Sequence, residues 1–530
     1  MSVKKNKSSL KRLTAAVLLA VISLLAMTKT AAAMTISVDI GKSDIKQFQV
    51  LKDDFRYTRI TGNKLGKLPE TEVTLSITND GSVIPVKRGL RKTRNQYWDI
   101  LFEPGRWTME DGKVSLMLPI ALVEKDANCT HQGSMVISGN QAAYQIAAET
   151  CSYFQFNAQG IASVTITSQE DTVSAKVQST YLDELEGRLK SVSIKTINSD
   201  HPLFEPAIFA QEDFINPASM SLYGAVIDGS HYVSDCPTRA AAYADCNHMP
   251  LPAYSLAKSL IGGVGLMRFE ALYPGFKDYL VKDLIPECDD WEDVTLSHLL
   301  NNTSGRFDSL APHRDEDKHI FAFLEKKTAA QKTDFACNRY PRQTAPGQQW
   351  VYHTIEFWLL GVAMQNFWQQ KFGESADFYN DLLNPIWREL ELSPLIQSPH
   401  RADNQPFTGL GLMLLRTDVA KIAQAFTTSN SPFDKLLDTE MLDQAMQKTS
   451  PSPRLSAGNE NLSYSNGFWA WNAAPTLECE SSTWIPFMSG FGGISVVFLP
   501  EGDAYYYFSD GNVFRYAEVI QHLHADRPFC

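Results

Sequence analysis

A serine and a lysine stand three residues apart in Ser255-Leu256-Ala257-Lys258, at the start of a segment whose apolar periodicity predicts a helix. At this spacing both side chains lie on one face of a helix, close enough to touch. A serine hydroxyl becomes a strong nucleophile only when a base removes its proton, and a lysine held away from water has a pKa low enough to be that base. The pair therefore indicates nucleophilic catalysis by Ser255.

The spacing alone identifies little, because Ser8 with Lys11 and Ser43 with Lys46 match it by accident. Further short segments follow Lys258 along the chain and set this pair apart from the others. They are VTLSHLLNNTSG at 294–305, APG at 345–347, WVYHT at 350–354, LLG at 359–361, GL at 409–410, TDVA at 417–420 and SGFGG at 489–493.

In this order the segments resemble the serine β-lactamase and penicillin-binding-protein superfamily, and more closely its class C, esterase and aminohexanoate-oligomer-hydrolase branch. The resemblance covers about residues 203–530. It implies an α/β (α+β) domain of the β-lactamase/transpeptidase type, with a mainly antiparallel sheet flanked by helices. It also implies that Ser255 is acylated, and that Lys258 and Tyr352 serve as the acid and base groups.

Two departures from the family pattern bear on the substrate. The second motif is often Tyr-x-Asn, and here Thr354 replaces the asparagine whose amide binds a substrate carbonyl. The third motif carries lysine or histidine in members that bind β-lactams, and here Met488 precedes Ser489-Gly490. The missing cation removes the expected partner of a substrate carboxylate, which argues against a true β-lactamase or D-alanyl carboxypeptidase.

The resemblance implies substrate-binding roles for a second set of residues. Thr354, Ser489 and Gly490 would contact the substrate, and the backbone N–H groups of Phe491 and Ser255 would form the oxyanion hole. Arg306 is a candidate for the missing cation, because it directly follows the Ser304-Gly305 motif, but the sequence does not say whether it reaches the cleft.

Other candidates are better explained by structure than by chemistry. His298 and His353 are interpreted as buried structural histidines, although His353 could tune Tyr352. Gly262-Gly263-x-Gly265 lacks the context of a dinucleotide loop and predicts close helix packing. No Gly-x-Ser-x-Gly segment occurs, which excludes the usual α/β-hydrolase nucleophile. The cysteines lack zinc-ligand spacing, so we expect no metal site. The acyl-enzyme mechanism that the resemblance implies needs no metal and no organic cofactor.

The elements that must position this site lie in the second part of the chain. At 530 residues and 44% hydrophobic composition, the chain is long enough for two or three domains. Residues 34–200 alternate as short strands with turns, which predicts an all-β domain of the sandwich or barrel type. A proline-rich linker follows near 201–217. In 203–530, hairpins at both ends with helices between them predict one sheet built from the two ends.

Residues 1–33 have a basic start, a short apolar run and Ala31-Ala32-Ala33, and therefore read as a secretory signal peptide; an uncleaved N-terminal anchor is the alternative. Eight cysteines follow, and export favours disulfides. Pairing between sequence neighbours, 129 with 151, 236 with 246, 288 with 337 and 479 with 530, is one of 105 possibilities. These features predict a periplasmic or secreted protein with no membrane segment after signal cleavage.

The net charge is −12, and −18 once residues 1–33 and their six basic side chains are removed. An acidic surface repels phosphate backbones, which argues against nucleic acid as a partner. The sequence thus predicts an exported serine hydrolase acting on a small or peptide-like ester or amide. The alternatives are a catalytically inactive relative that binds cell-wall or peptide ligands, and a β-lactamase or D-alanyl carboxypeptidase.

Overall fold

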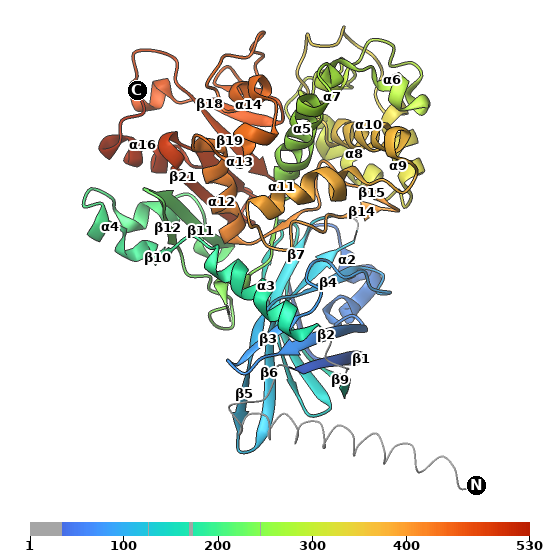
Figure 1. The fold of residues 1–530 in the computed structure, drawn as a ribbon, viewed down its shortest axis with the longest axis vertical. Coiled ribbons are helices and arrows are strands. Elements are labelled where there is room, and N and C mark those ends of the chain that lie inside the picture. Colours follow the sequence, from blue (N-terminus) through green and yellow to red (C-terminus); the bar gives the residue numbers. More distant parts are fainter. Residues whose placement is uncertain (1–33, 126, 169–172, 244) are drawn as a thin grey trace. The chain divides into compact units, whose positions relative to one another are not determined.

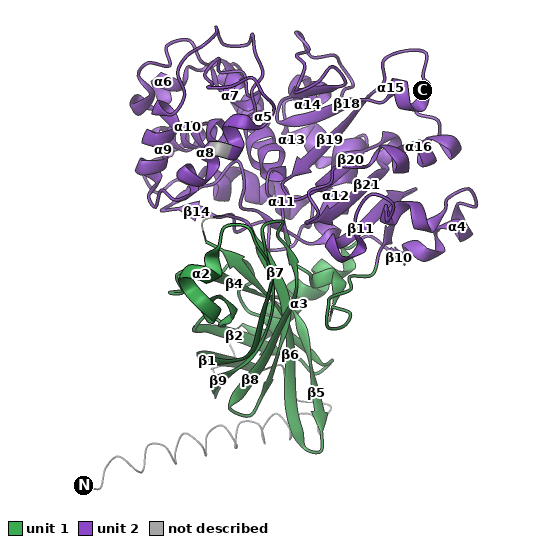
Figure 2. Ribbon diagram, turned by 180° about the vertical axis from the view of Figure 1, so that it is seen from behind, with its two compact units in different colours: residues 1–125, 129–188, 235–251 green, residues 126–128, 189–234, 252–530 purple. Residues whose placement is uncertain are grey.

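The protein is described from a computed structural model, which covers residues 34–125, 127–168, 173–243 and 245–530. The predicted signal peptide, 1–33, lies outside the described residues. The chain divides into two compact units (Figure 2). Unit 1 comprises the described residues up to 125 together with 129–188 and 235–251, and unit 2 comprises 127–128, 189–234 and 252–530. The chain therefore crosses between the units several times, the last time within β13 (Leu251–Pro252).

Unit 1 is a nine-stranded antiparallel sheet in the order β4-β6-β5-β3-β2-β1-β9-β8-β7, and a further pairing of β6 with β7 closes it on itself. This is the barrel form of the two alternatives expected from the sequence. The strands are β1 (Met34–Asp53), β2 (Thr71–Ile77), β3 (Ser82–Pro85), β4 (Trp98–Phe102), β5 (Gly105–Glu110), β6 (Lys113–Glu124), β7 (Thr130–Ser138), β8 (Gln141–Thr150) and β9 (Phe154–Ser168). Two helices, α2 (Tyr57–Thr61) and α3 (Ser174–Glu186), accompany them.

Alternation along the strands fills the interior of unit 1. In β9, Phe156, Ala162 and Val164 are buried, whereas Gln159 and Ser163 on the alternate positions are exposed. Period-two burial of this kind is what one solvated and one covered sheet face require. Strand residues with aliphatic or aromatic side chains make up most of this core.

Four disulfides join Cys129 to Cys151, Cys236 to Cys246, Cys288 to Cys337 and Cys479 to Cys530. The pairing of sequence neighbours is confirmed. Disulfides persist in oxidising compartments, so their number indicates that the protein folds outside a reducing cytosol. The clusters of Cys129 with His131 and of Cys479 with His524 have their sulfurs in these bonds and so lack free thiolates for a metal.

Unit 2 is built on an eight-stranded sheet in the order β10-β12-β11-β21-β20-β19-β18-β17, antiparallel except for the β10–β12 pair (Figure 1). Pairing of β11 with β21 joins the two ends of the unit, as the hairpin pattern predicted. The strands are β10 (Ser191–Ser193), β11 (Met220–Ile227), β12 (Ser230–Val233), β17 (Leu462–Ser465), β18 (Phe468–Asn472), β19 (Trp484–Gly490), β20 (Ile494–Phe498) and β21 (Ala504–Ser509).

Helices cover both faces of this sheet. Val497 of β20 packs in one core with Val519 and Ile520 of α16 (Ala517–Asp526). The next residue, Phe498, points the other way, and its ring lies 5.4 Å from that of Phe426 in α12 (Arg416–Thr427). This is the helix-flanked, mainly antiparallel α/β arrangement that the sequence predicted.

The remaining helices of unit 2 lie largely between β12 and β17 along the chain. They are α4 (Ile197–Asp200), α5 (Val264–Leu272), α6 (Val281–Leu284), α7 (Leu296–Leu300), α8 (Arg314–Leu324), α9 (Ala329–Asn338), α10 (Thr354–Phe372), α11 (Asn384–Glu389), α13 (Pro432–Leu436), α14 (Thr439–Ala445) and α15 (Ala474–Leu477). Short strands β14 (Arg401–Ala402), β15 (Gln405–Pro406) and β16 (Met413–Leu414) precede α12. Within the described ranges, the structure has no helix long and apolar enough to cross a membrane.

Candidate active site

Ser255 sits in a tight turn that leads into a helix. The backbone N–H groups of Leu256, Ala257 and Lys258 each bond to the carbonyl three residues earlier, and a π-helical segment, Lys258–Gly263, follows and continues into α5. Tyr254, just before the serine, has a φ of 42°, a conformation that costs a non-glycine residue energy. Both features are common where a fold must aim a functional side chain.

Asn128 holds this strained turn in place. Its Oδ1 accepts hydrogen bonds from the backbone N–H of Tyr254 at 2.9 Å and of Gly411 at 3.2 Å. Asn128 is 1% exposed and follows β6 in the chain, far from every motif that the sequence analysis singled out. No spacing pattern could have connected it with Ser255.

Lys258 is buried and has three oxygen partners. Its Nζ lies 2.9 Å from Ser255 Oγ, 2.8 Å from Thr354 Oγ1 and 3.1 Å from the carbonyl oxygen of Gly409. Burial lowers the pKa of Lys258 from its usual 10.5 to about 8, although the negative charge of Glu316 raises it in part. A substantial share of this amine is therefore neutral in mildly alkaline solution, with a lone pair able to take a proton.

Tyr352 lies over Lys258, just before α10. Lys258 Nζ is 4.8 Å from the centroid of the tyrosine ring, and the Tyr352 hydroxyl is hydrogen-bonded to Ser255. Burial and then the charge of Glu316 raise the pKa of Tyr352 well above its usual value, while the bond to Ser255 lowers it. The phenol therefore stays protonated at a pH at which Lys258 is partly neutral.

Glu316, in the first turn of α8, is a site residue that the sequence analysis missed. Its carboxylate accepts the backbone N–H of Thr354 at 2.8 Å and a short hydrogen bond from the Thr354 hydroxyl. The Thr354 hydroxyl therefore donates to Glu316 and accepts from Lys258 at the same time. Glu316 belongs to an acidic run with Asp315 and Asp317 that is ordinary at a helix N-terminus, so its type and position gave no signal.

His353 is fully buried, and its hydrogen bonds link α8 to α10. Its Nδ1 lies 3.0 Å from Glu356 and its Nε2 3.2 Å from Asp315, and its ring stacks on Tyr340. Burial opposes protonation, but the hydrogen bonds to Asp315 and Glu356 outweigh it and raise the pKa of His353 to about 9. The interpretation of His353 as a satisfied structural histidine is confirmed, and the ion cluster fixes the helix that carries Glu316.

The His353 cluster predicts a pH-dependent stability. Because the folded-state pKa is above the ordinary 6.5, the cluster stabilises the fold fully below pH 6.5 and loses that contribution as the pH rises to about 9. We expect the midpoint of thermal unfolding to fall more steeply over this range in the wild type than in His353→Gln.

The matched control is His298→Gln. His298 caps α7 through Thr295, and burial lowers its pKa, so its replacement should not flatten the same pH dependence. Parallel pH profiles for the wild type and His353→Gln would show that the cluster does not carry the charge assigned to it.

Packing confirms the structural reading of the glycines near Lys258. A Cβ atom on Gly262 would come within 2.7 Å of the ring of Phe357, and one on Gly265 within 3.2 Å of Met364. Both partners belong to α10. The glycines thus allow the helix after Ser255 to lie close to the helix after Tyr352.

The end of β19 brings the third motif beside the serine. A Cβ atom on Gly490 would lie 2.9 Å from the carbonyl oxygen of Ala253 and 3.0 Å from Leu256, the residues that flank the nucleophile turn. The ring of Phe491 is 5.7 Å from that of Tyr254 and is 44% exposed. Ser489 is half-buried and pairs with Ser495 of β20.

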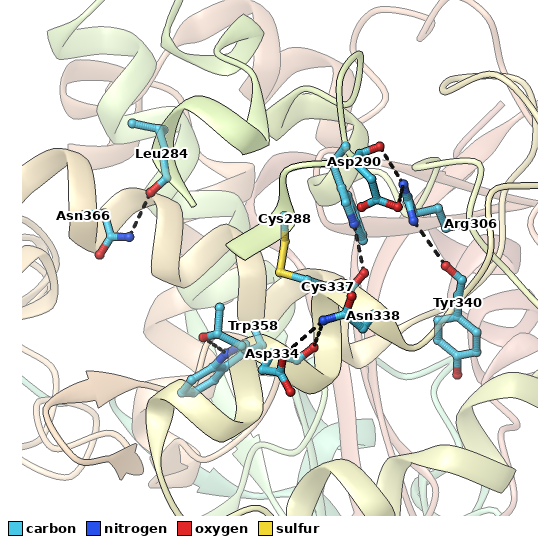
Figure 3. Close-up of a disulfide and its surroundings, with 12 residues drawn as sticks. Leu284, Cys288, Asp290, Arg306, Asp334, Cys337, Asn338, Tyr340, Trp358 and Asn366 are labelled. Carbon is cyan, nitrogen blue, oxygen red and sulfur yellow. Dashed lines mark hydrogen bonds and ion pairs between the residues drawn. A yellow bond between two sulfur atoms is a disulfide. The ribbon is translucent and has the colours of Figure 1, made fainter. Parts of the chain in front are cut away.

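The structure provides no substrate-binding cation at Met488, which occupies the position of the family's lysine or histidine, or at Arg306, the candidate replacement. Met488 is 1% exposed and apolar. Arg306 donates to the backbone carbonyls of Asp290 and Tyr340 and pairs with the Asp290 carboxylate at 2.8 Å, beside the Cys288–Cys337 disulfide (Figure 3). Its guanidinium also stacks over Trp291. These contacts engage the Arg306 guanidinium within the fold, so it does not serve as a partner for a substrate carboxylate.

A pocket of about 170 Å³ adjoins Tyr352. Its walls include Leu310, Pro312, His313 and Trp350, and the rings of His313 and Trp350 lie 5.6 and 6.1 Å from that of Tyr352. Among the residues that the structure describes, no lysine, arginine, aspartate or glutamate lines it. Gln349 and Ser456 also line it, so the pocket has polar atoms but, among its described lining residues, no carboxylate, ammonium or guanidinium group that would pair with a charged substrate group.

Comparisons with known proteins give distant structural similarities. No family model matches the chain, and no curated protein matches it. Similar solved structures include a putative 6-aminohexanoate-dimer hydrolase from Bacillus anthracis (12% identity, TM-score 0.44, 60% of this chain and 79% of the other). A penicillin-binding protein from Bacillus halodurans (15%, 0.43, 60% and 98%) and EstCE1, a hydrolase with promiscuous acyltransferase activity (14%, 0.47, 62% and 99%), are also similar.

At such identities and TM-scores the similarity carries no conclusion about activity. The residues and contacts of this chain are therefore the basis for any activity proposed for it.

Proposed function

We propose that the protein is a serine hydrolase that cleaves an ester or amide through an acyl-enzyme on Ser255. One observation carries the proposal: a buried lysine of lowered pKa lies 2.9 Å from the Ser255 hydroxyl, and Tyr352 bonds to the same oxygen. A nucleophile that contacts its base and a second proton carrier is the arrangement that acyl transfer needs.

The pKa values assign the proton steps. Lys258 takes the Ser255 proton as the serine oxygen attacks the carbonyl carbon. Its amine loses its own proton at a lower pH than the Tyr352 phenol does, so Lys258 is the group that is free to accept one. Tyr352 stays protonated and gives its proton to the leaving alcohol or amine, and Lys258 returns a proton to Tyr352. Water then attacks the acyl-enzyme by the reverse route, releasing the acid and restoring the serine hydroxyl.

Substrate-stabilising roles follow from the position of β19. The backbone N–H groups of Ser255 and Phe491 would receive the oxyanion, since the packing of Gly490 brings both segments together. Ser489, near the end of β19 and before Phe491, is proposed to contact the substrate there, whereas the Thr354 hydroxyl is bonded to Lys258 and Glu316. The proposal involves no metal and no organic cofactor.

The substrate is proposed to be a neutral or cationic ester or short amide, because the pocket beside Tyr352 is uncharged and Arg306 and Met488 offer no carboxylate partner. We expect short p-nitrophenyl esters to be hydrolysed with a kcat/KM at least about tenfold above that for a chromogenic cephalosporin. The reverse order would favour the alternative, a β-lactamase or D-alanyl carboxypeptidase.

We further propose that the protein acts in the periplasm or after secretion. Four disulfides support an oxidising compartment. The basic and apolar start of the chain supports export.

The direct test is the intact mass of purified protein before and after a serine-reactive fluorophosphonate. An activated serine displaces fluoride and gains one phosphonyl group, so one adduct is expected. A folded protein that gains none would favour the rival from another class, an inactive relative that binds cell-wall or peptide ligands without turning them over.

A further inference from the structure

The partners of Lys258 determine where its lone pair points. A neutral lysine amine has two hydrogens and one lone pair. Two of its three partners are acceptors, Thr354 Oγ1 and the carbonyl oxygen of Gly409. If both hydrogens go to these acceptors, the lone pair faces the third partner, Ser255 Oγ. This is the orientation that a base for Ser255 needs.

Thr354 is an acceptor toward Lys258 only because its own proton is engaged elsewhere. A hydroxyl can donate or accept, and a Thr354 hydroxyl that turned around would donate into the lysine lone pair and block it. The Glu316 carboxylate only accepts, and it takes the Thr354 hydroxyl proton while the Thr354 backbone N–H holds its other oxygen at 2.8 Å. Both oxygens of Glu316 are thus tied to one residue.

We propose that Glu316 is a positioning residue that acts through Thr354: it fixes the direction of the Thr354 hydroxyl and thereby aims the Lys258 lone pair at Ser255. The inference rests on the proposed serine-hydrolase function and deepens it. In this proposal Thr354 orients the amine of Lys258, whereas the asparagine in the corresponding family motif binds the substrate carbonyl.

Glu316 has an electrostatic effect that is separate from this orientation. Its charge raises the pKa of Lys258, and it also acts on Tyr352, Tyr340 and His353. Removing the charge while keeping an acceptor oxygen should therefore lower the pKa of Lys258 further. Two substitutions separate the effects: Glu316→Gln removes the charge and retains an acceptor for the hydroxyl, and Glu316→Ala removes both.

The test is the rate of fluorophosphonate labelling across a pH series in the full-length protein. Glu316→Ala should slow labelling about tenfold or more, because part of the general-base contribution is lost. Glu316→Gln should keep more of the rate and move the midpoint of its rise to lower pH than in the wild type. Asp317→Asn removes the same charge from the next position of α8 and is the matched control, expected to change neither.

A double-mutant cycle shows whether Glu316 acts through Thr354. In a Thr354→Val background, which has no hydroxyl to orient, Glu316→Ala should slow labelling by less than about twofold further. Thr354→Ser, which keeps the hydroxyl, should label faster than Thr354→Val. General damage to α8 would instead add the full effect of Glu316→Ala in both backgrounds, and that additivity would overturn the inference.

The result also separates this inference from the proposed function. A folded wild type that is not labelled at any pH contradicts both. A labelled wild type with additive variants, or with equal rates for Glu316→Ala and Asp317→Asn, contradicts the role of Glu316 and leaves the acyl-enzyme on Ser255 in place. Circular dichroism and the thermal midpoint of each variant establish that it is folded before rates are compared.

Discussion

Replacement of Ser255 by alanine is expected to abolish the fluorophosphonate adduct and all turnover of ester substrates, while the protein stays folded. The side chain is half-buried, and its oxygen is the atom that Lys258 and Tyr352 both contact. Removing it leaves a base with nothing to deprotonate. Nucleophile and base act as one unit, so the loss should reach about three orders of magnitude or more. Intact mass and the initial rate of p-nitrophenyl ester hydrolysis measure it.

The control serine is Ser259, which lies one helical turn further along the same segment. Its hydroxyl is buried and donates to the carbonyl oxygen of Gly467 at 2.6 Å. Ser259→Ala should keep the adduct and lose about 1 kcal/mol of stability for the broken hydrogen bond. An adduct that persists on Ser255→Ala, or that disappears from Ser259→Ala with the fold intact, would place the reactive group elsewhere.

The second large effect is expected from Lys258→Met. Methionine fills similar space without an amine, so the protein should fold but lose its base. General-base catalysis is worth about a hundredfold to ten-thousandfold in rate, and the labelling rate should fall by that order. The wild-type rate should rise with pH through about 8, because only the neutral amine accepts a proton, and level off above it. Lys258→Met should lack this rise.

Tyr352→Phe is the comparison that distinguishes the two bases. With Lys258 as base, Tyr352→Phe slows hydrolysis but keeps the rise through about pH 8. If Lys258→Met kept that rise and Tyr352→Phe lost it, the phenol would be the base. The assignment of proton steps would then be reversed.

The parts of the fold that the sequence predicted are those with a strong local signal, either a regular spacing of apolar residues or an apolar run that ends at turn residues. Hairpins such as β11–β12 and β20–β21 are short apolar runs separated by turn residues, so their approximate bounds and even their pairing into one sheet were accessible. The return of 235–251 to unit 1 was not accessible, because no local pattern distinguishes a segment that changes partners. The π-helical turn after Ser255 was likewise read as ordinary helix.

The site divides in the same way. Ser255, Lys258 and Tyr352 belong to short motifs whose spacing carries chemical meaning, and the structure brings the three side chains together. Glu316 and Asn128 belong to no motif. Each acts by a hydrogen bond to a residue more than thirty positions away, a relation that exists only in the folded chain.

Asn128 also limits how the gene could be cut. The asparagine that supports the turn before the nucleophile is encoded between two barrel strands, upstream of the stretch at 203–530 that carries every catalytic motif. In the other direction, 235–251 and the Cys236–Cys246 loop are encoded inside that stretch but fold with the barrel. A truncated chain that starts at 203 therefore lacks Asn128, which bonds to the turn before Ser255, and it still contains 235–251, which belongs to unit 1. The boundary between the two units thus does not fall at one point in the gene, and a truncation that separates them must keep Asn128 with the nucleophile and 235–251 with the barrel.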